Sequence, residues 1–276
     1  MRRKLIKCFV EVFAVILSLV IFGIPFYFVI LNSFKNRTEA AEMNISWPSE
    51  FRIIENYSEV LSTNHGVVIR AFFNSTIITV LSLLVLVIIS SMAGFILQRR
   101  TGKGSNLINF LVLSGLMIPP AVVPTIWVLN NLGLFKTIQG LVFVEAALQF
   151  PFATILYKGF MATIPREIDE AAIIDGCGPL RLYIQVLLPL LKSVTSTVVV
   201  LSAVTYFNDF VNPLYFLPGA KNITVQLSLY HFTSMYNTSW NLLFADVVLI
   251  SIPPLILFIF FNKKIISGMT AGAVKA

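Results

Sequence analysis

The residue types that carry out covalent or metal chemistry are scarce in this sequence and far apart. Its two cysteines are Cys8 and Cys177, and its two histidines are His65 and His231. These spacings offer neither a disulfide framework nor a set of metal ligands. Two such histidines do not fit a Ser-His-Asp arrangement either. We therefore expect no catalytic residue, no metal and no cofactor in this chain, which we predict is not an enzyme.

One segment has the composition of a phosphate-binding loop, Thr101 to Ser105. The pattern of such a loop begins with a glycine, where this chain has Leu97, and ends on a Ser or Thr, where it has Gly104. A basic turn between two helices explains the segment better. If the protein uses ATP, another subunit must hydrolyse it.

The elements that hold these residues must be membrane-spanning helices. Of the 276 residues 57% are hydrophobic and only 12% are charged, against about 25% charged in an ordinary soluble domain. The mean hydropathy is +0.86. The net charge of +7 would suggest nucleic acid in a soluble protein. Here the rules of membrane insertion account for it, so we expect a lipid bilayer as partner and no nucleic acid.

A helix needs roughly 20 apolar residues to cross a bilayer, and six stretches qualify within a single domain of residues 1–276. Lys and Arg set the orientation of such helices. The segment before the first span and those after the second and sixth spans, together with Lys158, Arg166, Arg181 and Lys192 around the connection between the fourth and fifth spans, hold 14 of the 20 Lys and Arg. This bias predicts both termini in the cytoplasm. The predicted spans are 12–31, 71–97, 107–130, 140–160, 186–208 and 243–262.

Few polar residues lie inside these spans. We expect Glu11 to pair with Lys7 one turn away, and Glu145 and Asp246 to reach water near the outer ends of their helices. The candidates for a substrate pathway follow the fifth span, where amides and a carboxylate stand beside aromatic rings. An alternative is a polar cap at a helix end. The candidate residues are Tyr206, Asn208, Asp209 and Asn212.

Prolines recur at membrane depth, where each one removes a backbone hydrogen bond and favours a kink. We expect them to shape a cavity. They are Pro119, Pro120, Pro124, Pro151, Pro253 and Pro254.

A helical hairpin is predicted between the fourth and fifth spans, in a loop of residues 161–189. Its first helix starts after Pro165 with acidic residues, which complement the helix dipole, and Gly176 ends that helix. Ala171 and Ala172 provide small side chains on one face. An amphipathic pair lying on the membrane would instead carry bulky apolar and basic residues. The composition favours docking into a groove of a cytoplasmic protein.

The hairpin resembles the "EAA" motif of binding-protein-dependent ABC importer permeases. The matching residues are Glu170-Ala171-Ala172, Gly176 after three residues, and Val186-Leu187-Leu188-Pro189 after nine more, with Val186 where Ile is usual. Other segments resemble the carbohydrate branch, in particular the shorter six-span permease of maltose-type and multiple-sugar importers. They are 31–35, 56–57, 74–75, 117–120, 208–210 and 268–275.

This resemblance implies an all-α membrane protein with the type I ABC importer permease fold and a cytoplasmic coupling helix. It implies one half of a sugar translocation pathway in a bacterial cytoplasmic membrane. The implied partners are a second permease subunit, two ATPase subunits that hydrolyse ATP, and an external sugar-binding protein. The coupling residues carried over to this chain are Glu170, Ala171, Ala172, Asp175, Gly176 and Pro189.

Two further contacts follow from the resemblance. The last external connection, residues 211–241, is expected to reach the binding protein through Ser228, Tyr230, His231 and Phe232. The C-terminal tail, residues 263–276, is expected to run as an extended chain between the ATPase subunits and to contact them through Thr270, Gly272 and Val274.

Two alternatives stay open. A related permease for a glycerol phosphate or a polyamine would require basic or acidic residues, respectively, in its cavity, and the spans have no central Lys or Arg. A self-contained secondary transporter would require intramembrane ion-coupling groups or paired broken repeats, and the sequence has neither.

Overall fold

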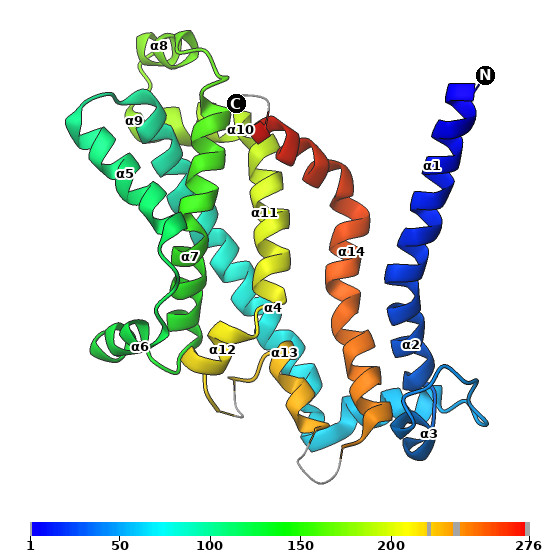
Figure 1. Ribbon diagram of the computed structural model, residues 1–276. Coiled ribbons are helices and arrows are strands. Elements are labelled where there is room, and N and C mark those ends of the chain that lie inside the picture. The colour runs from blue at the N-terminus through cyan, green and yellow to red at the C-terminus, as the bar shows by residue number, and fades with distance from the viewer. Residues whose placement is uncertain (1, 220–221, 234–237, 274–276) are drawn as a thin grey trace. The chain divides into compact units, whose positions relative to one another are not determined.

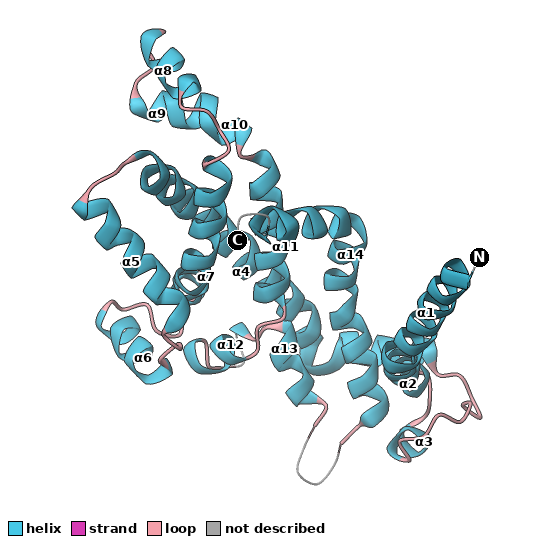
Figure 2. Ribbon diagram, turned by 45° about the horizontal axis from the view of Figure 1, so that its top comes forward, coloured by secondary structure: helices cyan, strands magenta, loops and turns pink. Residues whose placement is uncertain are grey.

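The computed structural model describes residues 2–219, 222–233 and 238–273, and every regular element in these residues is a helix (Figures 1 and 2). The chain divides into two compact units. The first comprises residues 1–71 and 225–252, and the second comprises residues 72–224 and 253–276. Two long helices, α4 (Ile53–Arg99) and α14 (Trp240–Ala273), begin in the first unit and continue into the second.

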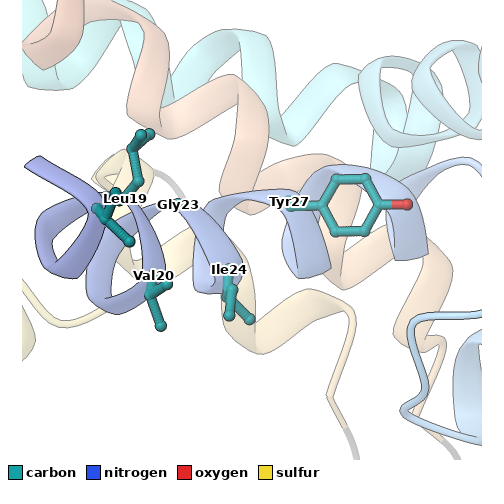
Figure 3. Close-up of a pocket in the computed structure, with 6 residues that line it drawn as sticks. Leu19, Val20, Gly23, Ile24 and Tyr27 are labelled. Carbon is teal, nitrogen blue, oxygen red and sulfur yellow. The ribbon is translucent and has the colours of Figure 1, made fainter.

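In the first unit the chain starts with one apolar helical stretch. It consists of α1 (Arg2–Ser18), a π-helical turn η1 (Leu19–Gly23) and α2 (Ile24–Ser33). Leu19, Val20 and Ile24 project outward around this turn together with Tyr27 (Figure 3). Only 6% of the most apolar window of this stretch is buried within the chain. Its surface therefore suits contact with lipid or with another apolar helix, because it presents few polar groups that could bind a polar solute.

Lys7 and Glu11 on α1 form the expected ion pair, with Nζ and Oε1 3.9 Å apart and both side chains mostly exposed. An exposed pair of this kind contributes little stability.

A buried polar network follows α2. The ammonium group of Lys35 is fully buried and donates to both the backbone oxygen and Oδ1 of Asn44, each at 2.8 Å. Burial lowers the pKa of Lys35, and the nearby carboxylates of Glu39 and Glu42 oppose that shift. The short helix α3 (Arg37–Ala41) lies between these residues and starts at Asn36, whose side chain accepts from the Glu39 amide.

The same network joins α4 and α14. The amide of Asn56 donates to the backbone oxygens of Ser33 and Lys35 at 2.8 and 2.9 Å, and accepts from the Asn241 side chain at 2.9 Å. Phe28 on α2 and Phe244 on α14 stack edge to face, with ring centroids 5.5 Å apart. The buried Asn56 side chain thereby has a partner for both its nitrogen and its oxygen, as burial requires.

Helix α4 is interrupted near its start. Asn64, His65 and Gly66 all have positive φ angles, of 47°, 55° and 74°. Three consecutive left-handed residues break the helix, and for Asn64 and His65 this conformation is strained. The predicted second span, 71–97, lies wholly in the part of α4 after the break.

The second unit is built around α7 (Ile138–Met161), which contacts α5 (Lys103–Met117), α11 (Lys192–Phe207) and α12 (Val211–Phe216) (Figure 1). Two glycines let neighbouring helices come close to it. A β-carbon on Gly94 of α4 would lie 2.6 Å from Cβ of Tyr157, and one on Gly115 of α5 would lie 2.7 Å from Cγ of Pro151. These positions accept no side chain, which is the common device for tight helix packing in membranes.

Not every predicted span is one straight helix. By length and composition, four helices in the described residues could cross a membrane, and a fifth span is possible if one bent pair is counted. The predicted third span, 107–130, divides into α5 and α6 (Val122–Asn131) because Pro119 and Pro120 hold the residues around them extended. The predicted fifth span, 186–208, bends by 75° at Leu191.

The expected extended tail is wrong for residues 267–273. Helix α14 continues to Ala273, since alanines favour helix enough to offset Gly268 and Gly272. Thr270 and Gly272 are thus helical, and Val274 lies outside the described residues.

The close approach at Gly94 leads to a stability prediction. Gly94→Ala should lower the thermal midpoint of the detergent-solubilised protein, because the new methyl group overlaps Tyr157. We expect the overpacking to cost about 1–3 kcal/mol, against roughly 1 kcal/mol gained in helix propensity. The matched control is Gly159→Ala on α7, where an added β-carbon meets nothing within 4 Å. Equal thermal midpoints for the two variants would contradict the tight packing.

Candidate functional site

A cavity of about 920 Å³ lies in the second unit, where α5, α7, α11 and α12 meet. Its lining combines two kinds of side chain. The apolar residues are Leu116, Met117, Ile118, Pro119, Pro120, Leu148, Phe152 and Val204. The polar residues are Thr205, Glu145, Gln149, Asn208, Asp209 and Asn212. Apolar walls with a few convergent polar groups are typical of sites for small organic ligands.

The break at Pro119 and Pro120 helps to form this cavity. Because α5 ends at Met117 and α6 begins at Val122, a short extended segment lines the wall where a continuous helix would have run. The expectation that prolines shape a cavity is therefore confirmed for Pro119 and Pro120, both of which line it.

Glu145 is the most deeply buried polar residue of the lining, with 3% of its surface exposed. Its Oε1 accepts a hydrogen bond from the Asn212 side chain at 3.3 Å. The carboxyl group of Asp209 lies close enough to interact with it. Three side chains from three separate elements thus converge on one corner of the cavity.

Asp209 has a second role. Its Oδ1 accepts from the backbone amides of Val211 at 2.9 Å and Asn212 at 3.3 Å, and so caps the start of α12. The two interpretations of this segment from the sequence, a lining residue and a helix cap, both describe Asp209.

Of the four pathway residues predicted from the sequence, three line the cavity and one does not. Tyr206 is 4% exposed and belongs to the apolar core around Tyr157 and Leu187. The sequence analysis missed Glu145, for which we expected only contact with water near a helix end. The sequence did contain a signal for Glu145. Gln149 follows it by four residues, and residues four apart share one face of a helix, so the two could have been read as a polar patch on one face of this span.

The predicted hairpin is present and lies in the same unit. It consists of α8 (Glu167–Ile174), α9 (Pro179–Arg181), a π-helical segment η2 (Leu182–Leu187) and α10 (Leu188–Leu190). Gly176 has a φ of +80°, and the Cys177 amide bonds back to the Ala172 oxygen at 2.9 Å. This is the usual glycine end of a helix.

One ion pair anchors α8. Nε of Arg99, the last residue of α4, lies 2.6 Å from Oδ2 of Asp169, and both side chains are nearly buried, with 12% and 13% exposed. Arg99 also donates from Nη2 to the Ile164 oxygen at 3.0 Å. Nothing in the sequence pattern linked these residues, since 70 positions separate them.

The structure divides the predicted coupling residues between two surfaces. Ala172 is 8% exposed and packs into the chain's own core, together with Ile168. We correct the expectation that both alanines face a partner, because Ala172 forms part of the contact that holds α8. The exposed residues are Glu170, Ala171, Ile173, Ile174, Asp175, Gly176 and Pro189.

The second half of the hairpin is fixed to α4 by Tyr183. Its hydroxyl group lies 2.5 Å from Oγ of Ser91, and its ring lies 6.4 Å from that of Phe95. Leu182 and Leu187 are buried beside it, whereas Leu180 and Ile184 are exposed. The hydrogen bonds of the π-helical segment η2 join residues five apart, which helps to place Leu182 and Leu187 on one buried face.

In the first unit, the segment α13 (Val225–Ser228) and η4 (Leu229–His231) contains the predicted binding-protein contacts. Ser228 is fully buried and donates to Oδ2 of Asp246 at 2.8 Å, and Phe232 is 4% exposed. These two are therefore internal residues, contrary to expectation. Tyr230 and His231 are exposed, and Nδ1 of His231 lies 3.2 Å from the Asn64 amide.

A chain of membrane-length apolar helices with a partly polar cavity among them defines a membrane permease. The chain belongs to the family of binding-protein-dependent transport system inner membrane components, whose model matches residues 87–271. Within that family it is a carbohydrate ABC importer permease with the type I fold.

Three relatives illustrate the likeness. The chain is 31% identical over 277 residues to the probable starch degradation products transport system permease protein AmyC of Thermoanaerobacterium thermosulfurigenes, covering 100% of both chains. It is 32% identical over 255 residues to the melibiose/raffinose/stachyose import permease protein MelC of Bacillus subtilis (strain 168), covering 91% of each. A chain of a bacterial ABC transporter that imports the acidic polysaccharide alginate shares the fold, with a TM-score of 0.78, 19% identity, and 93% and 96% coverage.

The anchor of α8 can be tested with the chain's own thiol. Asp169→Asn should speed the labelling of Cys177, which lies in the turn after α8, in a protein whose Cys8 is replaced by Ser. Losing the ionic partner of Arg99 is expected to cost about 1.4 kcal/mol, or roughly tenfold in the labelling rate. Glu167→Gln, an exposed acid in the same first turn, is the matched control and should leave the rate unchanged. A rate unaffected by Asp169→Asn would show that the ion pair does not hold the hairpin.

Proposed function

We propose that this chain forms one half of the translocation pathway of an ATP-driven importer of oligosaccharides. The observation that carries the proposal is the cavity, whose lining combines amide and carboxyl groups with apolar side chains such as Phe152. Sugars present hydroxyl groups to hydrogen-bond partners and C–H faces to apolar surfaces, so a lining of both kinds suits a sugar. The names of the relatives, which refer to starch degradation products and raffinose-type sugars, support the same class.

The coupling mechanism follows from what the hairpin is attached to. At one end, α8 is tied to the last residue of α4 through Arg99 and Asp169. At the other, α10 leads through the bend at Leu191 directly into α11. Helix α11 ends at Phe207, next to the cavity residues Asn208 and Asp209. A push on the hairpin would therefore be transmitted along α11 to the cavity, as rigid-body alternating access requires.

The surface that an ATPase would push is the exposed part of the hairpin. Ile173 and Ile174 are 59% and 85% exposed beside the acidic residues Glu170 and Asp175. Apolar anchors with charged neighbours are typical of a protein interface. In this proposal the hairpin lies in the cytoplasm of a bacterial cell, as do both termini, and the C-terminal residues Thr270, Gly272 and Val274 make a second ATPase contact.

A second permease subunit would complete the pathway. The first apolar helix buries almost nothing within its own chain, and its grooves are lined by apolar side chains with one serine and one tyrosine. A partner permease would cover part of this surface and leave the rest to lipid. The description of the family supports an external binding protein as a further partner, which would meet Tyr230 and His231.

Of the alternatives, a permease for glycerol phosphate fits poorly, since the described lining of the cavity contains two acids and no Lys or Arg. A polyamine permease is compatible with those acids, but the relatives named for a substrate class carry sugars in their names.

Uptake by the whole complex in proteoliposomes tests the proposal. The complex should take up at least one labelled neutral oligosaccharide, such as maltotriose or raffinose, only when ATP is enclosed with the ATPase subunits. Uptake of spermidine or glycerol 3-phosphate alone, or sugar uptake without any ATPase subunit, would overturn it.

Gly176→Asp tests the coupling role of the hairpin. Since only glycine adopts a φ of +80° without strain, we expect normal membrane insertion but at least tenfold less ATPase copurification and sugar uptake. Gly104→Asp on α5 is the control, because it adds the same charge where a β-carbon meets nothing within 4 Å. Full uptake by the Gly176 variant would remove the hairpin from the mechanism.

The binding-protein contact has its own test. The double variant Tyr230→Ala with His231→Ala should reduce uptake about tenfold while leaving basal ATPase activity intact, because both side chains are exposed. Replacement of Leu180, which is equally exposed but lies on the hairpin, should instead leave the affinity for the binding protein unchanged. Wild-type affinity for the binding protein in the double variant would contradict the contact.

A further inference from the structure

The cavity carries an unbalanced charge. Among its lining residues the ionisable side chains are Glu145 and Asp209, and neither a lysine nor an arginine accompanies them. Glu145 accepts from the Asn212 side chain, Asp209 accepts from two backbone amides, and the two carboxyl groups also hydrogen-bond each other. Because a hydrogen bond between two carboxyl groups requires a proton on one of them, the pair carries a single negative charge when the other group is ionised, and no cation of the lining balances it.

The position of these groups makes that charge effective. Glu145 is 3% exposed, and apolar side chains make up much of the lining around it. In such surroundings water screens a charge poorly, and a unit charge several ångströms away is felt far more strongly than in bulk solvent. An anionic solute in the cavity would be repelled, whereas a neutral one would find hydrogen-bond acceptors.

The two carboxyl groups are also held in place. Asp209 is fixed by its two backbone hydrogen bonds at the start of α12, and Glu145 is fixed by Asn212 from that same helix. A solute that enters the cavity meets a preformed group of acceptors, and the cost of orienting them has already been met on folding.

We infer that Glu145 and Asp209 determine substrate charge, so that this permease admits neutral or cationic saccharides and rejects anionic ones such as uronates and sugar phosphates. The inference rests on the proposed function, because it assigns the selectivity of that same cavity. It also separates this chain from the alginate importer that shares its fold. The common fold carries an acidic polysaccharide there, and the two acids would oppose such a substrate here.

The charge of the cavity can be measured without knowing the sugar. A single cysteine is placed in the lining by Thr205→Cys, with Cys8 and Cys177 replaced by Ser, in the assembled complex in membranes. Thr205 is exposed to the cavity, and its hydroxyl group bonds only within its own helix, to the Leu201 oxygen. The probes are two methanethiosulfonate reagents of similar size, one with a trimethylammonium group and one with a sulfonate group.

The readout is the ratio of the two labelling rates, divided by the same ratio for 2-mercaptoethanol in solution. The same thiolate attacks the sulfur of both reagents and displaces methanesulfinate, so the ionisation of the cysteine cancels in the ratio. We expect the cationic reagent to be favoured by about tenfold or more. The double variant Glu145→Gln with Asp209→Asn should bring the ratio close to that in solution, because it removes both ionisable groups. The new amides keep the oxygens that accept hydrogen bonds, so the local structure should be retained.

A variant in the opposite direction guards against misfolding of the double variant. Gln149→Glu adds a third acid one turn from Glu145 and should raise the ratio further. A ratio equal to or below that in solution for the Thr205→Cys protein, or one unmoved by all these substitutions, would overturn the inference.

The outcome is separable from that of the proposed function. Uptake of a neutral oligosaccharide together with a ratio of one would leave the sugar importer standing and remove the charge selection. A high ratio without any sugar uptake would support a negative cavity and contradict the proposal that this chain belongs to a sugar importer.

Discussion

The second unit depends on the close contact between backbones at Gly94 and Gly115. Helix α7 carries Glu145 and Gln149 toward the cavity, and it can lie between α4 and α5 only because these two glycines have no side chain. A membrane interior offers no hydrophobic driving force between helices, so contact area has to come from close packing. With α7 in place, the hydroxyl group of Tyr157 reaches Thr195 on α11 at 3.0 Å, which fixes the two helices that carry much of the cavity lining.

That arrangement also connects the hairpin to the cavity within the second unit. Helix α4 packs on α7 and ends at Arg99, which holds α8. Helix α11 packs on α7 and ends beside Asn208. The hairpin is thus joined at both of its ends to helices that share a single neighbour, so displacing it without changing the cavity would require breaking contacts at Gly94 or Tyr157.

The sequence predicted much of this architecture, because hydropathy and helix-ending glycines report local preferences. It identified apolar helices, the hairpin, and three of the cavity residues by their chemical type. It failed where the answer depended on distant partners. The burial of Glu145 depends on Asn212, and the pairing of Arg99 with Asp169 spans 70 positions. Ala172 was assigned to the wrong face because a small side chain suits a partner's surface and the chain's own core equally well. At Pro119 and Pro120 the composition indicated a span, but two successive prolines ended the helix.

The hydrogen bond between Asn241 and Asn56 joins residues that are 185 positions apart. During synthesis the first helices emerge long before Asn241 does, so Asn56 must wait for this partner until nearly the whole chain has been made. The buried Lys35 can donate its two hydrogen bonds to Asn44 early, but the network around it is closed only by the last helix. Until α14 has been made, the side-chain oxygen of Asn56 therefore lacks the donor that pairs with it in the finished protein.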